Sequence, residues 1–540
     1  MGLRPTWHRK SDAHQLVVYS DDFGKTWDIL GGTYAAKGSC DEPKCEELPN
    51  GNIVLSSRES GCRWFNTFTY TDKENGTGTW STAKASNTVT GGLSFGGNAT
   101  NGEIQVLRVL AQEGTEVHNI VLQSIPTAGN RSNVSIYYKN LDDPSSYSSP
   151  EEFSKGWTLG KVVAPYGSAY STMCVQADGK IAFFYEDGKS GAGYDMVYVP
   201  LTIAELTNNT YSEIVLPVQE TAGSTNEAVK LEGDVVSTTD VTEMVTSETT
   251  SIDLSEANIK GSVTAAQIQQ QVATATGNNN ALIIVSETTD DEGATNVIKK
   301  NDEAGTAYTC QNLHLSDNGT FTPPVSFTAA TANYNRTVAA NANDFGTICL
   351  PFSAVSDENI QFYQLTSSTG NAFVFTPIDE AEANTPVLYK RLNKENVTVN
   401  RTSVEVVPVR GEMAAAGTNY KMVGVFQPTS VVNAEETPAL DGYAKIVDPN
   451  CYYIKQGQFF SLNERMNLKP FRAYITPTNG GMMQVPLMNI NIEDNVHTDI
   501  QIIEGADKTV TIVYDLAGRR LQKPEKGLNI VNGQKIILKK

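Results

Sequence analysis

A short motif that recurs in the first third of the chain most constrains its fold. Its full form is Ser20-Asp-Asp-Phe-Gly-Lys-Thr-Trp27, a second form runs from Thr71-Asp72 to Gly78-Thr79-Trp80, and Gly156-Trp157 is the remnant of a third. In such a turn the Asp bonds backbone groups, the Gly takes a positive φ and the Trp packs between sheets. Recurrence at intervals of about 50 to 80 residues is typical of a β-propeller with one motif per blade. We expect a structural role for Ser20, Asp22, Gly24, Thr26 and Trp27.

Two runs of this region, 42–58 and 170–186, match each other as hairpins. Asn50-Gly51 in the first run falls on Asp178-Gly179 in the second. Such dipeptides between apolar runs are the strongest short-range hairpin signals, because both turn positions must tolerate a positive φ. The sequence therefore predicts two hairpins of the same design.

The open ends of these hairpins carry polar residues at matched positions. Glu42 and Arg58 are nearly equidistant from the first turn, and Tyr170 and Glu186 from the second. Charged residues at hairpin ends are usually solvated, but four at matched positions favour convergence on one rim. Arg58 and Arg131 would present two guanidinium forks to a planar carboxylate. The Tyr170 hydroxyl, with an unperturbed pKa of about 10, is a poor nucleophile until a base such as Glu42 takes its proton.

A tyrosine nucleophile suits one kind of substrate. A sugar with a carboxylate at its reacting carbon would repel an anionic nucleophile, whereas a neutral tyrosine relayed through a glutamate avoids that repulsion. Together with the recurring motif, these residues resemble the bacterial exo-α-sialidases (neuraminidases) of the Asp-box, or BNR-repeat, family over roughly residues 10–200.

The resemblance implies a six-bladed propeller, three arginines that clamp the carboxylate of sialic acid, a Tyr nucleophile with a Glu partner, and an Asp acid/base. By this resemblance Tyr170 is the nucleophile and Glu42 its partner, Arg58 and Arg131 are two clamp arginines, and Glu186 orients the remaining one. It implies sialylated glycans or glycoproteins as partners, and neither a cofactor nor a metal ion.

Two parts of the family pattern have no counterpart in this sequence. The first arginine, in an Arg-Ile-Pro motif, and the acid/base Asp belong to early blades of the family. We therefore expect residues 1–205 to be an N-terminally truncated propeller with impaired activity. A non-catalytic sialoglycan-binding surface protein and a structural propeller fragment with adhesive modules are the alternatives.

The remainder of the chain extends a mostly β expectation. We expect a linker at 206–228, a small mixed α/β module at 229–324, a β-sandwich-like accessory domain at 325–488 and a short C-terminal β domain at 489–540. The module has a helical patch at 262–272 and a buried strand run at 281–285.

The C-terminal residues resemble the sorting or anchoring domains of secreted Bacteroidetes proteins. The segments that carry this resemblance are Tyr514-Asp-Leu-Ala-Gly-Arg519 and Gly527-Leu-Asn-Ile-Val-Asn-Gly533, and 346–351 resembles accessory β-modules of such proteins. They imply a secreted, periplasmic or cell-surface protein that is anchored there through its C-terminal domain, although the first residues lack the apolar core of a signal peptide.

Composition excludes several other classes of protein. The chain has 61 acidic and 41 basic residues, a net charge of −20 and no Lys/Arg cluster, which argues against nucleic acid as a partner. No stretch approaches 18 apolar residues, so we expect no transmembrane segment. The seven cysteines lack Cys-x-x-Cys spacing, which argues against a disulfide scaffold and a zinc site and favours buried thiols.

Overall fold

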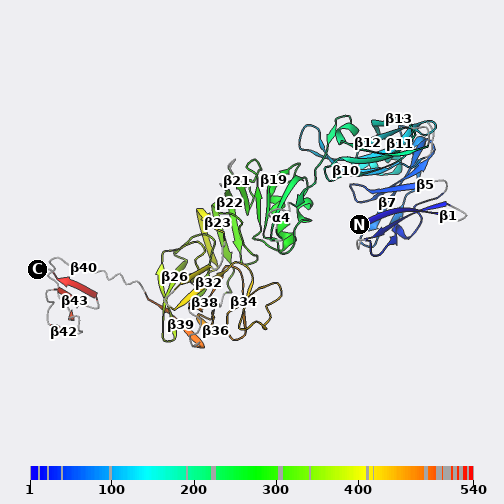
Figure 1. Ribbon diagram of the computed structural model, residues 1–540. Helices are drawn as coiled ribbons and strands as arrows, with labels where there is room; N and C mark the ends of the chain where they lie inside the picture. The colour runs from blue at the N-terminus through cyan, green and yellow to red at the C-terminus, as the bar shows by residue number, and fades with distance from the viewer. Residues whose placement is uncertain are drawn as a thin grey trace. The chain divides into compact units, whose positions relative to one another are not determined.

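The computed structural model describes most of the chain, in two compact units. The described residues are 2–9, 13–20, 24–37, 41–95, 100–189, 193–219, 225, 227–301, 308–339, 342–393, 395–408, 413–416, 419–478, 485–493, 501–502, 513–514, 520–521, 527–531 and 534–538. The first unit comprises 1–224, 229–244 and 253–268, and the second comprises 225–228, 245–252 and 269–540. Strands dominate the regular structure of both, which confirms the mostly β fold class (Figure 1).

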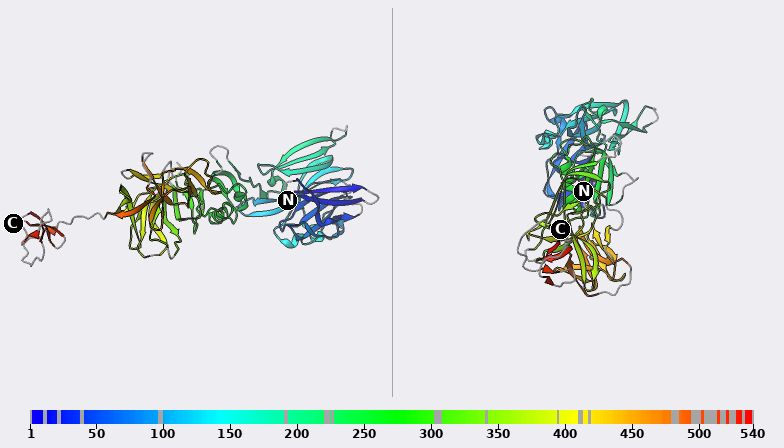
Figure 2. Two further views of the ribbon diagram at one scale, coloured as in Figure 1. Left: turned by 90° about the horizontal axis from the view of Figure 1, so that it is seen from below. Right: turned by 90° about the vertical axis from the view of Figure 1, so that its left-hand side faces the viewer.

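The first unit begins with antiparallel sheets in chain order (Figures 1 and 2). The first sheet holds β1 (Gly2–Arg9), β2 (Ala13–Ser20), β3 (Asp28–Ile29) and β4 (Ala36–Lys37). The second holds β5 (Asp41–Glu47), β6 (Ile53–Glu59), β7 (Cys62–Asp72), β8 (Thr77–Trp80) and β9 (Lys84–Ala85). The third holds β10 (Ile104–Ala111), β11 (Val117–Ala128), β12 (Ser132–Asn140), β13 (Thr158–Val175), β14 (Ile181–Asp187), β15 (Asp195–Leu201) and β16 (Tyr211–Ser212).

Successive sheets of this unit pack face to face. In β6, Ile53 and Leu55 pack with Val17 of the first sheet, while Val54 between them packs with Val121 of the third. Side chains alternate between the faces of a strand, so this sheet buries both of its faces. Antiparallel meanders stacked in this way have the arrangement of propeller blades.

The long strand β13 joins two sheet halves. Its first part pairs with β12, up to Gly167 opposite Ser132, and its second part pairs with β14, from Ser168 opposite Asp187. The register shifts between Ser168 and Ser171, so the strand leaves one half and enters the other at that point.

The two hairpin turns have the same geometry. Gly51 N donates to Leu48 O at 2.8 Å, and Gly179 N donates to Gln176 O at 2.9 Å. Only the glycines take a positive φ, +82° and +78°, so the expectation of positive φ at both turn positions is wrong. Each hairpin closes through a three-residue loop with Gly in the left-handed region, a geometry that needs only one such residue.

The recurring motif folds in part as expected. Ser20 Oγ accepts a hydrogen bond from Gly24 N at 2.8 Å, and Gly24 has φ +83°. In the second copy, Asp72 Oδ1 accepts from the backbone amides of two following residues. Asp22 lies outside the described residues, and Thr26 is exposed.

Trp27 is not buried between sheets, and the expectation that it would be is wrong. Its side chain is 40% exposed because the indole folds back on its own turn, where Nε1 donates to Gly24 O at 3.1 Å. The later tryptophans are half-buried: Trp80 packs on Phe68 at 5.1 Å and Trp157 stacks on Phe65 at 6.0 Å.

The short helices and the segment after the blades complete the first part of the chain. They are α1 (Pro150–Phe153), α2 (Ile203–Leu206), β17 (Val218–Gln219), β18 (Ala228–Val235), α3 (Thr239–Thr242), β19 (Ser251–Ile259) and α4 (Ala265–Thr276). The expected helical patch at 262–272 corresponds to α4, and the expected strand run at 281–285 to a buried strand from Leu282 to Val285. No helix of the described residues is long and apolar enough to cross a membrane.

The second unit contains two large sheets. One has the order β20 (Leu282–Val285), β21 (Val297–Lys300), β22 (Tyr308–Ser316), β23 (Phe327–Arg336) and β30 (Val397–Val406). The other has the order β24 (Phe345–Ile348), β29 (Val387–Arg391), β26 (Ile360–Thr369), β27 (Ala372–Ile378), β39 (Leu487–Ile492), β36 (Gln458–Ser461), β35 (Tyr452–Lys455), β38 (Arg472–Pro477), β32 (Tyr420–Val425) and β31 (Met413–Ala416). A shared core that includes Leu313, Tyr334, Phe352 and Phe362 packs them together.

Smaller sheets accompany these two. They are β25 (Ala354–Val355) with β28 (Glu380–Ala381); β34 (Ala444–Val447), β33 (Thr429–Val432) and β37 (Arg465–Leu468); and a C-terminal sheet of β40 (Gln501–Ile502), β44 (Gln534–Leu538), β43 (Gly527–Val531), β41 (Val513–Tyr514) and β42 (Arg520–Leu521). The six cysteines of the described residues are free thiols, and four of them are buried.

Candidate active site

Glu42 lies on a bulge at the start of β5. The register of β5 and β6 shifts between Asp41, opposite Arg58, and Lys44, opposite Ser56. Glu42 takes φ +41°, and Asp41 Oδ1 accepts a hydrogen bond from its amide at 2.9 Å. A bulge re-aims the side chain that it carries. The backbone irregularity therefore decides where the Glu42 carboxylate lies.

Tyr170 also lies on an irregularity. It falls within the register shift of β13, where the strand passes from one sheet half to the other. Its backbone amide donates to Glu186 Oε2 at 3.3 Å, so the second hairpin holds its end residues together as expected. Glu42 and Tyr170 thus both lie at irregular positions of their strands, and such irregularities are common at functional sites.

Three polar atoms of the two hairpins form a closed triangle. Arg58 Nη1 donates to Glu42 Oε1 at 2.6 Å and to Tyr170 Oη at 2.7 Å, and Tyr170 Oη donates to Glu42 Oε1 at 2.9 Å. Glu42 and Tyr170 are 128 residues apart in the chain. The convergence that the matched hairpins suggested is therefore present in the structure.

Arg131 reaches the same tyrosine from the turn between β11 and β12. Its guanidinium carbon lies 5.4 Å from the centre of the Tyr170 ring, and that of Arg58 lies 5.8 Å from it. Arg131 has φ +52°, and its carbonyl accepts from Ser168 N at 2.8 Å, which ties the turn to the crossing point of β13. Within the described part of the chain its guanidinium makes no ion pair.

The implied role of Glu186, which is to orient the remaining clamp arginine, stays a prediction. The recorded partner of Glu186 is the backbone amide of Tyr170, and among the described residues it has no arginine partner. Its observed contact holds the backbone of Tyr170 in place.

The protonation of Tyr170 follows from its surroundings. Burial raises the pKa of its hydroxyl, and the hydrogen bond to Glu42 raises it further, while the charges of Arg58 and Arg131 oppose the shift. Both main causes disfavour the phenolate. The phenol is therefore neutral at neutral pH and donates a hydrogen bond to Glu42.

A second layer of polar groups supports the triangle, and the sequence reasoning did not identify it. Glu103 Oε2 accepts from Lys44 Nζ and from Thr172 Oγ1, each at 2.7 Å, and Asn101 Oδ1 accepts from Ser171 N at 3.3 Å. Asn101 and Glu103 directly precede the first strand of the third sheet, as Glu42 stands at the start of the second. The position of Asn101 and Glu103 just before the first strand of a sheet is the sequence signal that could have identified them.

Arg63 is a further buried cation beside the site. It pairs with Arg58 across β6 and β7 and is fully buried. It donates to Ser56 Oγ, Ser56 O and Thr100 O at 3.0 to 3.1 Å. Burial lowers its pKa to about 10, so it still carries a charge at neutral pH. Its charge adds to the positive potential behind Arg58.

Comparisons with known proteins find likenesses among solved structures only. No family model and no curated protein matches the chain. Among solved structures, it is similar to the NanB sialidase of Streptococcus pneumoniae (19% identity, 38% of this chain and 29% of that one, TM-score 0.28) and to the intramolecular trans-sialidase of Ruminococcus gnavus (19%, 36% and 40%, 0.27). A GH93 α-L-arabinofuranosidase of Fusarium graminearum follows at 15% identity, with 37% of this chain and 58% of that one covered and a TM-score of 0.23. The chain spans well under half the length of either sialidase.

Proposed function

We propose that this chain carries part of the active site of a retaining exo-α-sialidase, which releases terminal sialic acid from glycoconjugates through Tyr170. The observation that carries the proposal is the triangle in which the Tyr170 hydroxyl donates to Glu42 and accepts from Arg58. A hydroxyl with a carboxylate as its proton acceptor has the arrangement of an activated nucleophile.

The two arginines fit a substrate that carries a carboxylate at its reacting carbon. Arg58 uses only Nη1 in the triangle, and the Arg131 guanidinium makes no ion pair among the described residues. Their remaining N–H groups are available for a planar carboxylate. A neutral phenol beside them can approach such a carbon without repulsion between like charges.

In the proposed reaction, Tyr170 Oη bonds to the anomeric carbon while its proton passes to Glu42 Oε1. The bond between that carbon and the leaving oxygen breaks, and the leaving oxygen takes a proton from a general acid. None of the described residues is assigned to that role. Water then attacks the anomeric carbon of the glycosyl-tyrosine and gives one proton to the deprotonated general acid. The bond from that carbon to Tyr170 Oη breaks, Glu42 returns its proton to Tyr170, and sialic acid leaves with its configuration retained.

A fluoride leaving group tests the nucleophile without the general acid. We expect 2,3-difluorosialic acid, whose C2–F bond breaks without protonation of an alkoxide, to lose its C2 fluoride and add one 3-fluorosialyl group to the full chain. Intact mass and peptide mapping should place it on Tyr170. Tyr170→Phe should abolish the adduct, whereas Tyr198→Phe, at an exposed tyrosine of β15, should retain it. An adduct elsewhere, or none, would contradict the proposal.

A second candidate is a sialoglycan-binding site without turnover. The observation that favours it is the pair of guanidinium groups on the ring of Tyr170. In that case calorimetric titration with 3′-sialyllactose should show binding that Arg131→Ala weakens and Tyr170→Phe preserves. Binding of this kind without any adduct from the fluorosugar would decide for the second candidate.

We also propose export of the chain and contact with sialylated glycoproteins at a cell surface. The C-terminal segments that resemble sorting or anchoring domains motivate this proposal, although residues 515–519 and 532–533 lie outside the described residues. Fractionation of producing cells tests it, and recovery of the whole protein from the cytoplasm would contradict it.

A further inference from the structure

A basic cavity opens in the second unit, far along the chain from the candidate active site. Its volume is about 520 Å³, and its walls come from the end of β23, from β24 and β29, and from β35, β37 and β38. The lining includes four basic side chains, Arg336, Arg465, Lys469 and Arg472, and no Asp or Glu. In a chain with 61 acidic and 41 basic residues, this local excess of positive charge is unusual.

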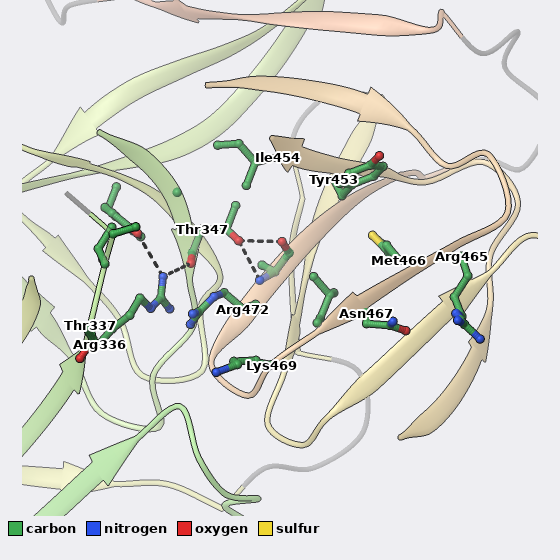
Figure 3. A pocket seen from close by; sticks show the side chains of 16 residues that line it. Arg336, Thr337, Thr347, Tyr453, Ile454, Arg465, Met466, Asn467, Lys469 and Arg472 are labelled. Carbon is green, nitrogen blue, oxygen red and sulfur yellow. Dashed lines mark hydrogen bonds between the residues drawn. The ribbon is translucent and has the colours of Figure 1, made fainter. Parts of the chain in front are cut away.

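The floor of the cavity is fixed by internal hydrogen bonds. Arg336, only 3% exposed, donates to the hydroxyls of Tyr334 and Tyr389 and to the carbonyls of Thr347 and Phe471 at 2.9 to 3.2 Å. Figure 3 shows part of this network. Because its donors are engaged, Arg336 supplies positive potential and rigidity and leaves direct binding to the outer residues.

Arg472 completes the floor. It binds Asp317 with both Nη atoms, at 2.8 and 2.6 Å. Asp317 offsets one of the two arginine charges, so the floor remains positive. Its groups are held in place before any ligand arrives, which reduces the entropy lost on binding.

The outer residues have free hydrogen-bond donors. Along β37 and just beyond it, Arg465, Asn467 and Lys469 are exposed, whereas Met466 between them is buried, as strand alternation requires. Arg465 Nη1 donates to Pro438 O, and Asn467 Oδ1 accepts from Ser430 Oγ at 2.7 Å, which leaves its amide nitrogen as the donor. Lys469 has no hydrogen bond or ion pair within the described residues. Figure 3 shows Arg336 and Arg472 at one end of the cavity, Arg465 at the other, and Lys469 and Asn467 between them.

The cavity also has apolar walls. Tyr453, Ile454 and Leu468 line it beside the cations. An inorganic anion such as phosphate would fill a small part of 520 Å³ and would leave this apolar surface wet. A sugar ring suits both parts, because its C–H faces pack on a tyrosine ring while its hydroxyls and acidic groups bind amide, guanidinium and ammonium donors.

We propose that this cavity binds a saccharide that carries carboxylate or sulfate groups. Lys469 and Arg465 bind the acidic groups, Asn467 binds a hydroxyl, and Tyr453 packs on the sugar ring. The site is independent of the proposed sialidase reaction, since all of its residues belong to the second unit.

The test is calorimetric titration of the full chain carrying Arg58→Ala, so that the candidate active site does not contribute. The probes are 3′-sialyllactose for the carboxylate arm, a heparin-derived disaccharide for the sulfate arm, lactose as the neutral match, and inorganic phosphate. We expect one acidic saccharide to bind at least about tenfold more tightly than lactose and phosphate, and less tightly as salt rises. Equal binding of lactose or of phosphate would overturn the proposal, as would no binding at all.

Matched variants locate the binding. In the same Arg58→Ala chain, Lys469→Gln and Arg465→Gln should each weaken the acidic saccharide by about tenfold, because each removes a charged donor. Lys455→Gln, at an exposed lysine of β35 that does not line the cavity, should have no effect. All three positions are exposed, so circular dichroism should show an unchanged fold. Undiminished binding by both cavity variants would overturn the proposal.

Discussion

Each compact unit has, among its described residues, a cluster of arginine, tyrosine and carboxylate whose tyrosine hydroxyl makes the same pair of hydrogen bonds. In the first unit, Tyr170 Oη donates to Glu42 at 2.9 Å and accepts from Arg58 at 2.7 Å. In the second unit, the Tyr334 hydroxyl donates to Asp317 at 2.5 Å and accepts from an arginine Nε at 2.9 Å. In each unit a tyrosine hydroxyl thus bridges a carboxylate and a guanidinium.

The clusters differ in their exposure to solvent. The side chains of Arg58 and Glu42 are 20% and 31% exposed, whereas those of Arg336 and Asp317 are 3% and 12% exposed. Tyr334 is fully buried and belongs to the core that joins the two large sheets. A ligand can therefore reach the first tyrosine and not the second. The same three residue types form a candidate site in the first unit and a buried structural contact in the second.

The largest expected difference between the clusters concerns turnover. If the fluorosugar labels Tyr170, Tyr170→Phe should lower the release of a fluorescent aryl group from a sialoside by about 10³-fold or more, because the nucleophile is gone. Tyr334→Phe should leave turnover unchanged. Equal losses in the two variants would remove the functional distinction between the clusters.

The next difference concerns stability. Arg336→Met should lower the free energy of unfolding of the second unit by about 2–6 kcal/mol, because it leaves the carbonyl oxygens of Thr347 and Phe471 without this buried donor, at about 1–3 kcal/mol each. Arg58→Met should cost the first unit about 1 kcal/mol or less, because Glu42 can be solvated. Urea unfolding followed by hydrogen exchange in each unit measures both changes. If Arg58→Met lowered the free energy of unfolding by more than Arg336→Met does, the first cluster and not the second would be the structural one.

The smallest expected difference is a dependence on acid. Burial would raise the pKa of Asp317, but the hydrogen bond from Arg472 and the charge of Arg336 outweigh it, and the pKa is lowered. The resulting stability is fully present above the ordinary pKa of about 3.9 and is lost as pH falls through the lower pKa of the folded state. Asp317→Asn should therefore flatten the acid side of a plot of unfolding free energy against pH, whereas Tyr170→Phe should leave that side unchanged. An unchanged acid slope in Asp317→Asn would contradict this account.

Much of the candidate site could be predicted because its pairings are local. Asn50-Gly51 and Asp178-Gly179 define their turns within a few residues, and the strand ends then follow from equal lengths. That logic places Arg58 beside Glu42. The same local reasoning fails for Trp27, because the exposure of its side chain depends on what packs against the sheet and not on its turn.

Other contacts have no local signal in the sequence because they join distant segments. The approach of Arg131 to Tyr170, which only the family resemblance implies, depends on a turn that Ser168 fastens to the crossing of β13. The pair of Arg472 with Asp317 spans 155 residues, and neither residue has a local pattern that indicates the other. Neither pair is marked by turn chemistry or alternation, which act over a few residues only.

The sequence by itself determined the hairpins, the strand-rich class and the residue types at the rim, since turn propensity and alternation act within single strands. Only the tertiary structure decided which cluster of arginine, tyrosine and carboxylate solvent can reach. Bulges at Glu42 and at the crossing of β13 aim the first cluster at a common point, and the packing of two sheets encloses the second. The physical reason is that exposure is a property of the packed sheets and not of the residues that they carry.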